Sequence, residues 1–165
     1  MIKYWQANSA RMMQLTIEHA RMVLIALFIA FLVAIVLIAV FLRKKNWMNS
    51  LIYFFSLLYS VPSYAFFAFL IPITGLGETT AIIVLAFYNE YVLLRTFITG
   101  IREVDPNYIE VARGMGMTQE EIFTKVQLPL SMPAIFSGLQ VALASTMAIA
   151  TIASTISAGD RKSVV

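Results

Sequence analysis

The sequence predicts an all-α polytopic membrane protein of about four transmembrane helices, with a polar helical loop on one side. The chain of 165 residues is 60% hydrophobic and only 13% charged, whereas soluble domains carry roughly 25% charged residues. Its charges lie between long uncharged runs, and these runs are long enough to cross a bilayer as helices. The modest length predicts a single transmembrane domain over residues 1–165.

Composition excludes several classes of function. The chain has no cysteine, and its one histidine is His19, so thiolate and multi-histidine metal sites are excluded and no cofactor is expected. It contains no glycine-rich phosphate loop with lysine, so the chain is not expected to bind ATP or to be an enzyme on its own. The basic residues flank apolar runs and the net charge is only +3, which favours the lipid bilayer over nucleic acid as a partner.

Four segments are predicted to cross the membrane. The first is the clearest, because 21 residues without charge make about 30 Å of helix. The second contains Pro62, where we expect a kink whose freed carbonyls are satisfied by neighbouring groups. A short turn at 75–78 leads into the third. The predicted spans are residues 22–42, 51–72, 79–97 and 132–156.

The positive charges of the short connections predict the orientation. Three follow the first span, none follows the second, and several lie in the loop at about 98–131. The first and third connections are therefore predicted to be cytoplasmic, and the turn at 75–78 to be external. Residues 1–21 are expected to form a separate lead-in helix at the external interface, with Tyr4 and Trp5 at headgroup depth.

The polar stretch at 110–129 and the residues just before it carry helix signals of their own. Asp105 followed by proline is typical of a helix start, so a short helix is predicted over 106–113. It is expected to end at Gly114 and Gly116, because glycines permit a sharp change of direction.

A second short helix is predicted to follow this glycine turn. The run at 118–121, Thr-Gln-Glu-Glu, has the pattern of a capping box. Ile122 and Val126 would then share one face. The helix is expected to end before Pro129, because the residue preceding proline disfavours helix.

The same stretch resembles the cytoplasmic signature of the inner-membrane permease subunits of ATP-binding-cassette importers. That signature is Glu-Ala-Ala, then Gly four residues after the last Ala, then a hydrophobic residue and Leu-Pro. Val111 replaces the central alanine, and Val126 stands where isoleucine is usual. The positions on the pattern are Glu110, Ala112, Gly116, Val126, Leu128 and Pro129.

The resemblance implies that this loop is a coupling helix that seats in a groove on a cytoplasmic ATP-binding-cassette ATPase. It also implies a second permease subunit as a homo- or heterodimer, an extracytoplasmic substrate-binding protein, and a multi-pass location in the cell's inner membrane. ATPase closure would move the loop and drive alternating access. The residues assigned to the joint are Glu110, Ala112, Gly114, Gly116, Val126, Leu128 and Pro129.

Weaker similarities over roughly residues 15–158 resemble the osmoprotectant branch, which imports glycine betaine, carnitine or choline. Two alternatives are an importer of amino acids or other small solutes, and a truncated, non-transporting membrane interaction protein. The family continues past the position of Gly159 into at least one more span, so we expect the chain to lack a C-terminal span.

Glu90 is an ionisable group at membrane depth, which makes it a functional-site hypothesis by default. With Tyr88 and Asn89 it is a candidate for a water-filled solute path, where its carboxylate could attract a quaternary ammonium. The alternative is that Glu90 pairs within the bundle or lies close to the inner interface, because Arg95 follows five residues later.

Two further patterns occur within the spans. Aromatic side chains of the second and third spans could form a cation–π track or pack against lipid. The small-residue pairs Gly138–Ala142 and Ala144–Ala148 of the fourth span predict a close helix–helix contact, within the subunit or across a permease pair.

Overall fold

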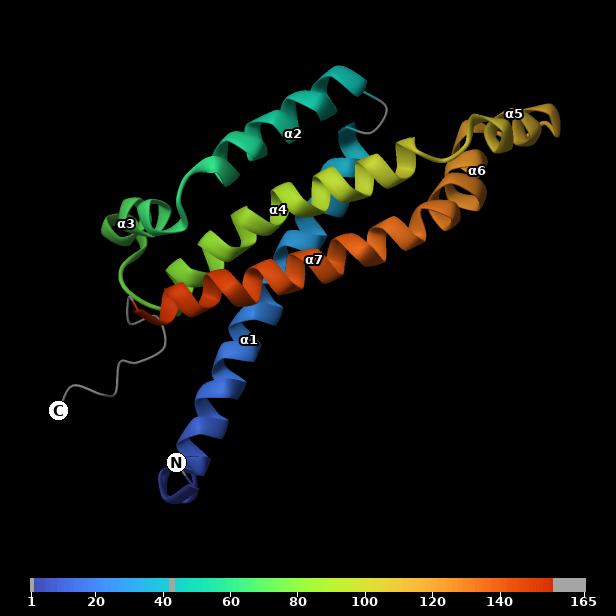
Figure 1. The fold of residues 1–165 in the computed structure, drawn as a ribbon. Helices are drawn as coiled ribbons and strands as arrows, with labels where there is room; N and C mark the ends of the chain where they lie inside the picture. The colour runs from blue at the N-terminus through green and yellow to red at the C-terminus, as the bar shows by residue number, and fades with distance from the viewer. Residues whose placement is uncertain (1, 42–43, 156–165) are drawn as a thin grey trace.

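The computed structural model describes residues 2–41 and 44–155, and it describes side chains within 9–153 except those of residues 42, 43 and 45. Every element in these ranges is helical, which confirms the predicted all-α class (Figure 1). The elements are α1 (Ile2–Phe41), α2 (Lys45–Ser60), α3 (Ser63–Thr74), α4 (Glu78–Arg102), α5 (Pro106–Gly114), α6 (Gln119–Ile122), the π-helical turn η1 (Phe123–Gln127) and α7 (Leu128–Thr155).

α4 is the central helix, and α1, α2, α3 and α7 all pack against it. In its apolar stretch 61% of the residues are buried, compared with 28% in α1 and 22% in the segment that ends in α7. Figure 1 shows α2, α4 and α7 running side by side, with α1 crossing them obliquely. The outward faces of α1 and α7 are therefore open to lipid or to partner chains.

Three helical segments are long and apolar enough to cross a membrane, and a bent pair of helices supplies a fourth candidate. The apolar stretches of these segments lie within Ser9–Phe41, Glu78–Arg102 and Gln119–Ala153. The pair consists of α2 and α3, which are bent by 95° at the break between them. This finding agrees with the prediction of about four spans.

The break between α2 and α3 is sharper than the kink expected at Pro62. The residue before this proline, Val61, takes an extended conformation with φ −70° and ψ 131°, as steric contact with the proline ring favours. Tyr88 of α4 donates its hydroxyl to the Val61 carbonyl, which satisfies a backbone group freed by the break. The expectation of one kinked helix over 51–72 was therefore wrong.

α1 is one continuous helix, and the expected separate lead-in helix does not form. No glycine or proline occurs between Ile2 and Phe41, so nothing in the sequence interrupts helical hydrogen bonding. The N-terminal part of α1 extends away from the other helices (Figure 1). The side chains of Tyr4 and Trp5 lie outside the part that the structure describes, so their predicted position at headgroup depth stays a prediction. The same holds for residue 156, the last of the fourth predicted span, and for the tail after it.

Polar contacts show which helix ends lie together. Arg21 forms an ion pair with both carboxylate oxygens of Glu78, each at 2.9 Å, which ties α1 to the start of α4. At the other end of α4, Arg102 donates to Asn49 Oδ1 at 2.9 Å. The connection between α1 and α2 and the loop after α4 are therefore at the same end of the bundle, and the turn before α4 is at the opposite end, as predicted.

Candidate functional site

The loop after α4 folds as the helix and glycine turn predicted from its caps. Asp105 Oδ1 accepts the Asn107 amide at 2.9 Å, with proline at the first helical position of α5. The chain then reverses at Gly116, whose φ is +82°. A Cβ at this position would meet nothing within 4 Å, so the glycine is required by its backbone conformation and not by lack of space.

The predicted capping box forms at the start of α6. Thr118 Oγ1 accepts the Glu121 amide at 3.3 Å, and Glu121 Oε2 accepts the Thr118 amide at 3.0 Å. Lys125 adds an ion pair to Glu121 Oε1 at 2.9 Å. Three hydrogen bonds lower the pKa of Glu121 to about 2. The bond from Lys125 has the largest effect, and the bonds from the Thr118 amide and hydroxyl have smaller ones.

The capping box predicts a pH dependence of the loop. Since the pKa of Glu121 is lowered from 4.5 to about 2 in the fold, its contribution to stability is fully present above pH 4.5 and is lost as the pH falls toward 2. A carbon-13 NMR titration of the Glu121 carboxyl should show a titration midpoint at about pH 2. In the Glu121→Gln variant the chemical shift of the Thr118 amide should stay constant between pH 4.5 and about pH 2. A titration midpoint near pH 4.5 for Glu121 in the wild type would contradict the prediction.

The second helix of the loop does not end before Pro129, contrary to the prediction. It passes through η1 into α7, so helix continues from Gln119 to the end of α7. In a regular α-helix the proline ring would meet the carbonyl four residues earlier. The π turn widens the helix just before this point, with the Leu128 amide bonded to the Phe123 carbonyl, and Pro129 falls in the first turn of α7.

α5 packs against α6 and η1 on one side and is exposed on another. Ala112, which is 4% exposed, and the fully buried Ile122 lie in the packed region. On the exposed side Tyr108, Val111 and Met115 are 58%, 63% and 75% exposed. They are spaced i, i+3 and i+7, and Met115 is the C-cap residue that follows α5. Together they form one apolar stripe along α5 and its cap, which we call the α5 face. Figure 1 shows α5 projecting from the end of the bundle.

The residues predicted for the joint take different positions around the α5 face. Ala112 is buried. Val126 is half-buried in η1, which packs against α5, and Leu128 is half-buried at the start of α7. The remaining four, Glu110, Gly114, Gly116 and Pro129, are exposed. Sequence reasoning missed Tyr108 and Met115 as surface residues, although their helical spacing with Val111 was a usable signal.

Glu90 is the middle residue of α4 (Glu78–Arg102) and is 3% exposed. It is therefore far from both ends of α4, and its position relative to the inner interface stays a prediction. Arg95 donates to the Tyr91 hydroxyl at 2.6 Å and is exposed. Among the described residues, nothing hydrogen-bonds to Glu90 Oε1.

Asn89 and Tyr88 point away from one another. Asn89 Oδ1 accepts the Thr146 hydroxyl of α7 at 2.7 Å, whereas Tyr88 reaches the α2–α3 break, with its ring 5.6 Å from Tyr59 and 6.0 Å from Phe66. Successive residues on a helix point about 100° apart, so the structure does not bring Tyr88 together with Asn89. Several of the other aromatic residues pack together at this break, while Tyr53, Phe54 and Tyr64 are exposed.

The family of transport proteins described as "Binding-protein-dependent transport system inner membrane component" matches residues 26–161. That range includes the α5 face, the glycine turn and the helices on either side. The chain belongs to this family. Its members are inner-membrane transport components, so the polytopic helical fold and a transport role belong together in this permease.

Named relatives support the same assignment. The permease is 36% identical over 158 residues to the choline transport system permease protein OpuBB of Bacillus subtilis (strain 168), covering 96% of this chain and 73% of that protein. It is 35% identical over 159 residues to the glycine betaine/carnitine/choline transport system permease protein OpuCB of the same organism, with the same coverage. It is also 35% identical over 158 residues to the carnitine transport permease protein OpuCB of Listeria monocytogenes, covering 96% and 72%.

α4 and α7 of the permease approach closely at glycines. A Cβ on Gly138 would lie 2.2 Å from Thr96 Oγ1, and one on Gly100 would lie 2.4 Å from Ala134 Cβ. The Gly138–Ala142 pair thus serves contact within the subunit, whereas Ala144 and Ala148 face outward. A movement of α7 would therefore displace α4 or change the packing between the two helices.

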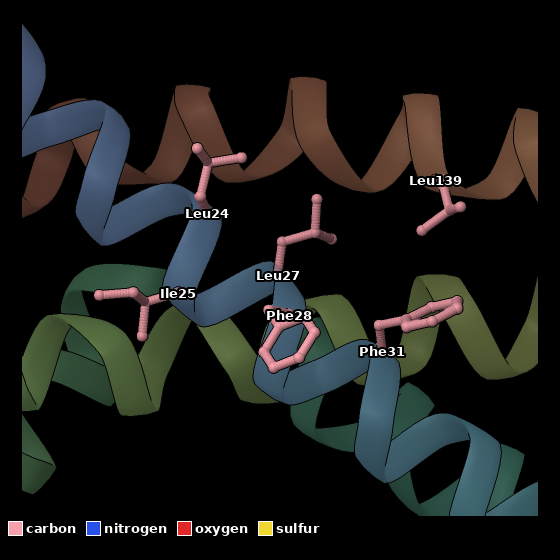
Figure 2. Close-up of a pocket in the computed structure, with 6 residues that line it drawn as sticks. All are labelled: Leu24, Ile25, Leu27, Phe28, Phe31 and Leu139. Carbon is pink, nitrogen blue, oxygen red and sulfur yellow. The ribbon is translucent and has the colours of Figure 1, made fainter.

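An apolar groove of about 530 Å³ lies between α1 and α7 (Figure 2). Five of its lining residues come from α1 and one from α7: Leu24, Ile25, Leu27, Phe28, Phe31 and Leu139. The lining side chains carry no polar atom, so the groove has no group that would recognise a polar solute.

Proposed function

We propose that the chain is the transmembrane permease subunit of an ATP-driven importer for the osmoprotectants glycine betaine, carnitine or choline. The observation that carries the docking part of this proposal is the α5 face, an apolar helix surface at the end of the bundle. The substrate class is supported by the names of three relatives that are 35–36% identical over nearly the whole chain.

The α5 face fits a protein groove. Tyr108, Val111 and Met115 are exposed and aligned along α5 and its C-cap, and an amphipathic helix that enters a groove presents anchors with this spacing. Glu110 is exposed beside them and can form hydrogen bonds at the rim. The partner we propose is a cytoplasmic ATP-binding-cassette ATPase, with the permease working alongside a second permease subunit and an extracytoplasmic binding protein in the cell's inner membrane.

The proposed coupling runs from α5 into the membrane. α5 is joined by the turn at Gly116 to a helix that continues from Gln119 through η1 into α7. α7 in turn packs on α4 through Gly138 and Gly100. A displacement of α5 would therefore tilt α7 and shift its contact with α4. The ATPase can drive this motion only if it contacts the loop differently in its two nucleotide states.

The proposal is tested by reconstituting the permease with its ATPase and binding protein in vesicles and measuring uptake of labelled choline and glycine betaine. ATP-dependent uptake is expected. Gly116→Pro should abolish both uptake and capture of the ATPase, because proline cannot adopt the +82° φ of this position or donate the amide that Arg113 O accepts at 3.0 Å.

Gln119→Ala is the matched control for this test, since Gln119 is exposed in the first turn of α6 and is not among the residues assigned to the joint. It should keep both activities. Uptake of amino acids but not of osmoprotectants would redirect the substrate assignment. ATPase capture without uptake of any solute would support the non-transporting alternative and overturn the proposed function.

A further inference from the structure

The apolar core of the permease is divided into two clusters that follow one another along the length of α4. One cluster contains Ala30 and Ala34 of α1 and extends toward the end that carries the loop. The other contains Ala26 of α1 and Ala150 of α7 and extends toward the opposite end. Between them, at the middle of α4, lie three buried polar side chains, Asn89, Glu90 and Thr146, which we call the polar layer.

Two atoms of the polar layer have no partner in the described part of the chain. They are Glu90 Oε1, an acceptor, and Asn89 Nδ2, a donor. Asn89 is 1% exposed and Glu90 is 3% exposed. Thr146 satisfies only the Asn89 oxygen, at 2.7 Å. Buried polar groups in native proteins are nearly always paired, so these two orphaned atoms require an explanation.

We propose that the polar layer recognises the solute inside the membrane, and that it takes a small molecule carrying both a positively charged ammonium group and an acceptor oxygen. Glu90 supplies the counter-charge for the ammonium, and Asn89 Nδ2 donates to the carboxylate or hydroxyl oxygen. Such a solute satisfies both orphaned atoms at once. A quaternary ammonium has no N–H, so its attraction to Glu90 is Coulombic, and this attraction is strong where water is excluded.

This inference rests on the proposed function and deepens it by naming the residues that select the solute. Two general observations support the position: an ionisable residue within a membrane marks a solute or ion path, and substrate sites of many transporters lie near the bilayer midplane. The polar layer is closed in this structure. It becomes accessible when α7 shifts against α4, since Thr146 belongs to α7 and Asn89 to α4.

Accessibility can be tested directly, because the permease has no cysteine of its own. Thr146→Cys introduces a single thiol into the polar layer. In the reconstituted importer hydrolysing ATP, a trimethylammonium thiosulfonate should label this thiol at least about tenfold faster than a neutral thiosulfonate, after correction for their rates with a free thiol in solution. Adding Glu90→Gln should abolish the preference.

The labelling has a matched control at the next residue. Met147 is 52% exposed on the outward side of α7, so Met147→Cys should show no preference that depends on Glu90. Labelling is read on this chain by mass, which separates it from thiols of the other subunits. No labelling of Thr146→Cys in any nucleotide state, with ATP-driven uptake intact, would overturn the inference and leave the proposed function standing.

Uptake provides a second readout. Glu90→Gln keeps the shape of the side chain and removes its charge, and it should lower the rate of choline uptake by at least about tenfold while ATPase capture stays normal. Glu90→Asp should keep more uptake than the glutamine variant. Ser145→Ala removes a hydroxyl that donates to the Ala142 carbonyl of its own helix at 3.0 Å, and this variant should behave as wild type.

The outcomes separate the two proposals. Choline uptake by Glu90→Gln within about twofold of wild type would show that Glu90 does not select the solute, because a lost charge interaction is worth at least about tenfold. Loss of ATPase capture in this variant would assign Glu90 a structural role and also overturn the inference. A wild-type importer that moves neither choline nor glycine betaine would overturn both the inference and the proposed function.

Discussion

Gly138→Leu is expected to destabilise the permease by several kcal/mol, because it forces α7 away from α4. Even a Cβ at this position would lie 2.2 Å from Thr96 Oγ1, 2.9 Å from Thr96 Cβ and 3.2 Å from Phe97 Cε1. The Thr96 hydroxyl is held by a hydrogen bond to the Val92 carbonyl at 2.7 Å. Overpacking of a tight core costs about 1–3 kcal/mol for small insertions, and more where the neighbours cannot move.

The measurement is the unfolding free energy of the purified protein in detergent, for Gly138→Ala and Gly138→Leu in turn. The loss should grow with the size of the side chain. Thr96→Ala, which removes the oxygen at 2.2 Å, should recover part of the loss in Gly138→Ala. Gly114→Ala, where a Cβ meets nothing within 4 Å, is the control. A Gly138→Leu protein as stable as wild type would mean that α4 and α7 do not pack at this distance.

Met115→Glu is expected to weaken capture of the ATPase by at least about tenfold, because interface anchors of this kind contribute about 2 kcal/mol or more. Met115 is 75% exposed at the end of α5. The change therefore places a charge in the proposed groove without disturbing the fold of the permease itself. Co-purification of the ATPase with the tagged permease, together with ATP-driven uptake, measures the effect.

Gln119→Glu is the matched control for the docking prediction. It adds the same charge in the same loop, at an exposed position in the first turn of α6, where a negative charge is favoured by the helix dipole. It should leave ATPase capture unchanged. Equal weakening by both variants would show that the loop responds to charge in general, and that the α5 face is not the contact surface.

Local chemistry explains what could be read from the sequence. The caps at Asp105 and Thr118 and the turn at Gly116 use side chains and backbone within a few residues of one another, so the helix–turn–helix of the loop followed from their order alone. The uncharged runs likewise predicted about four spans, since the bilayer sets the length of an apolar helix. The loop signature pointed to the family because its spacing is fixed along the chain.

Contacts between distant segments explain what could not be read. Pro62 predicted a change of direction, but its angle of 95° belongs to a break that Tyr88 stabilises from another helix. Continuation of helix past Pro129 depends on the π turn that precedes it. The expected change of direction formed at Pro62, whereas the expected helix end before Pro129 did not form. Both outcomes depended on neighbouring structure.

The sequence by itself determined that this protein is an all-α membrane permease with a capped polar loop, because hydropathy, caps and glycines act over short distances. Only the tertiary structure decided which sides of the helices face one another. It turned Tyr108, Val111 and Met115 outward while burying Ala112. It also buried Glu90 at the middle of α4, around which four helices pack, and left its Oε1 without a hydrogen-bond partner among the described residues.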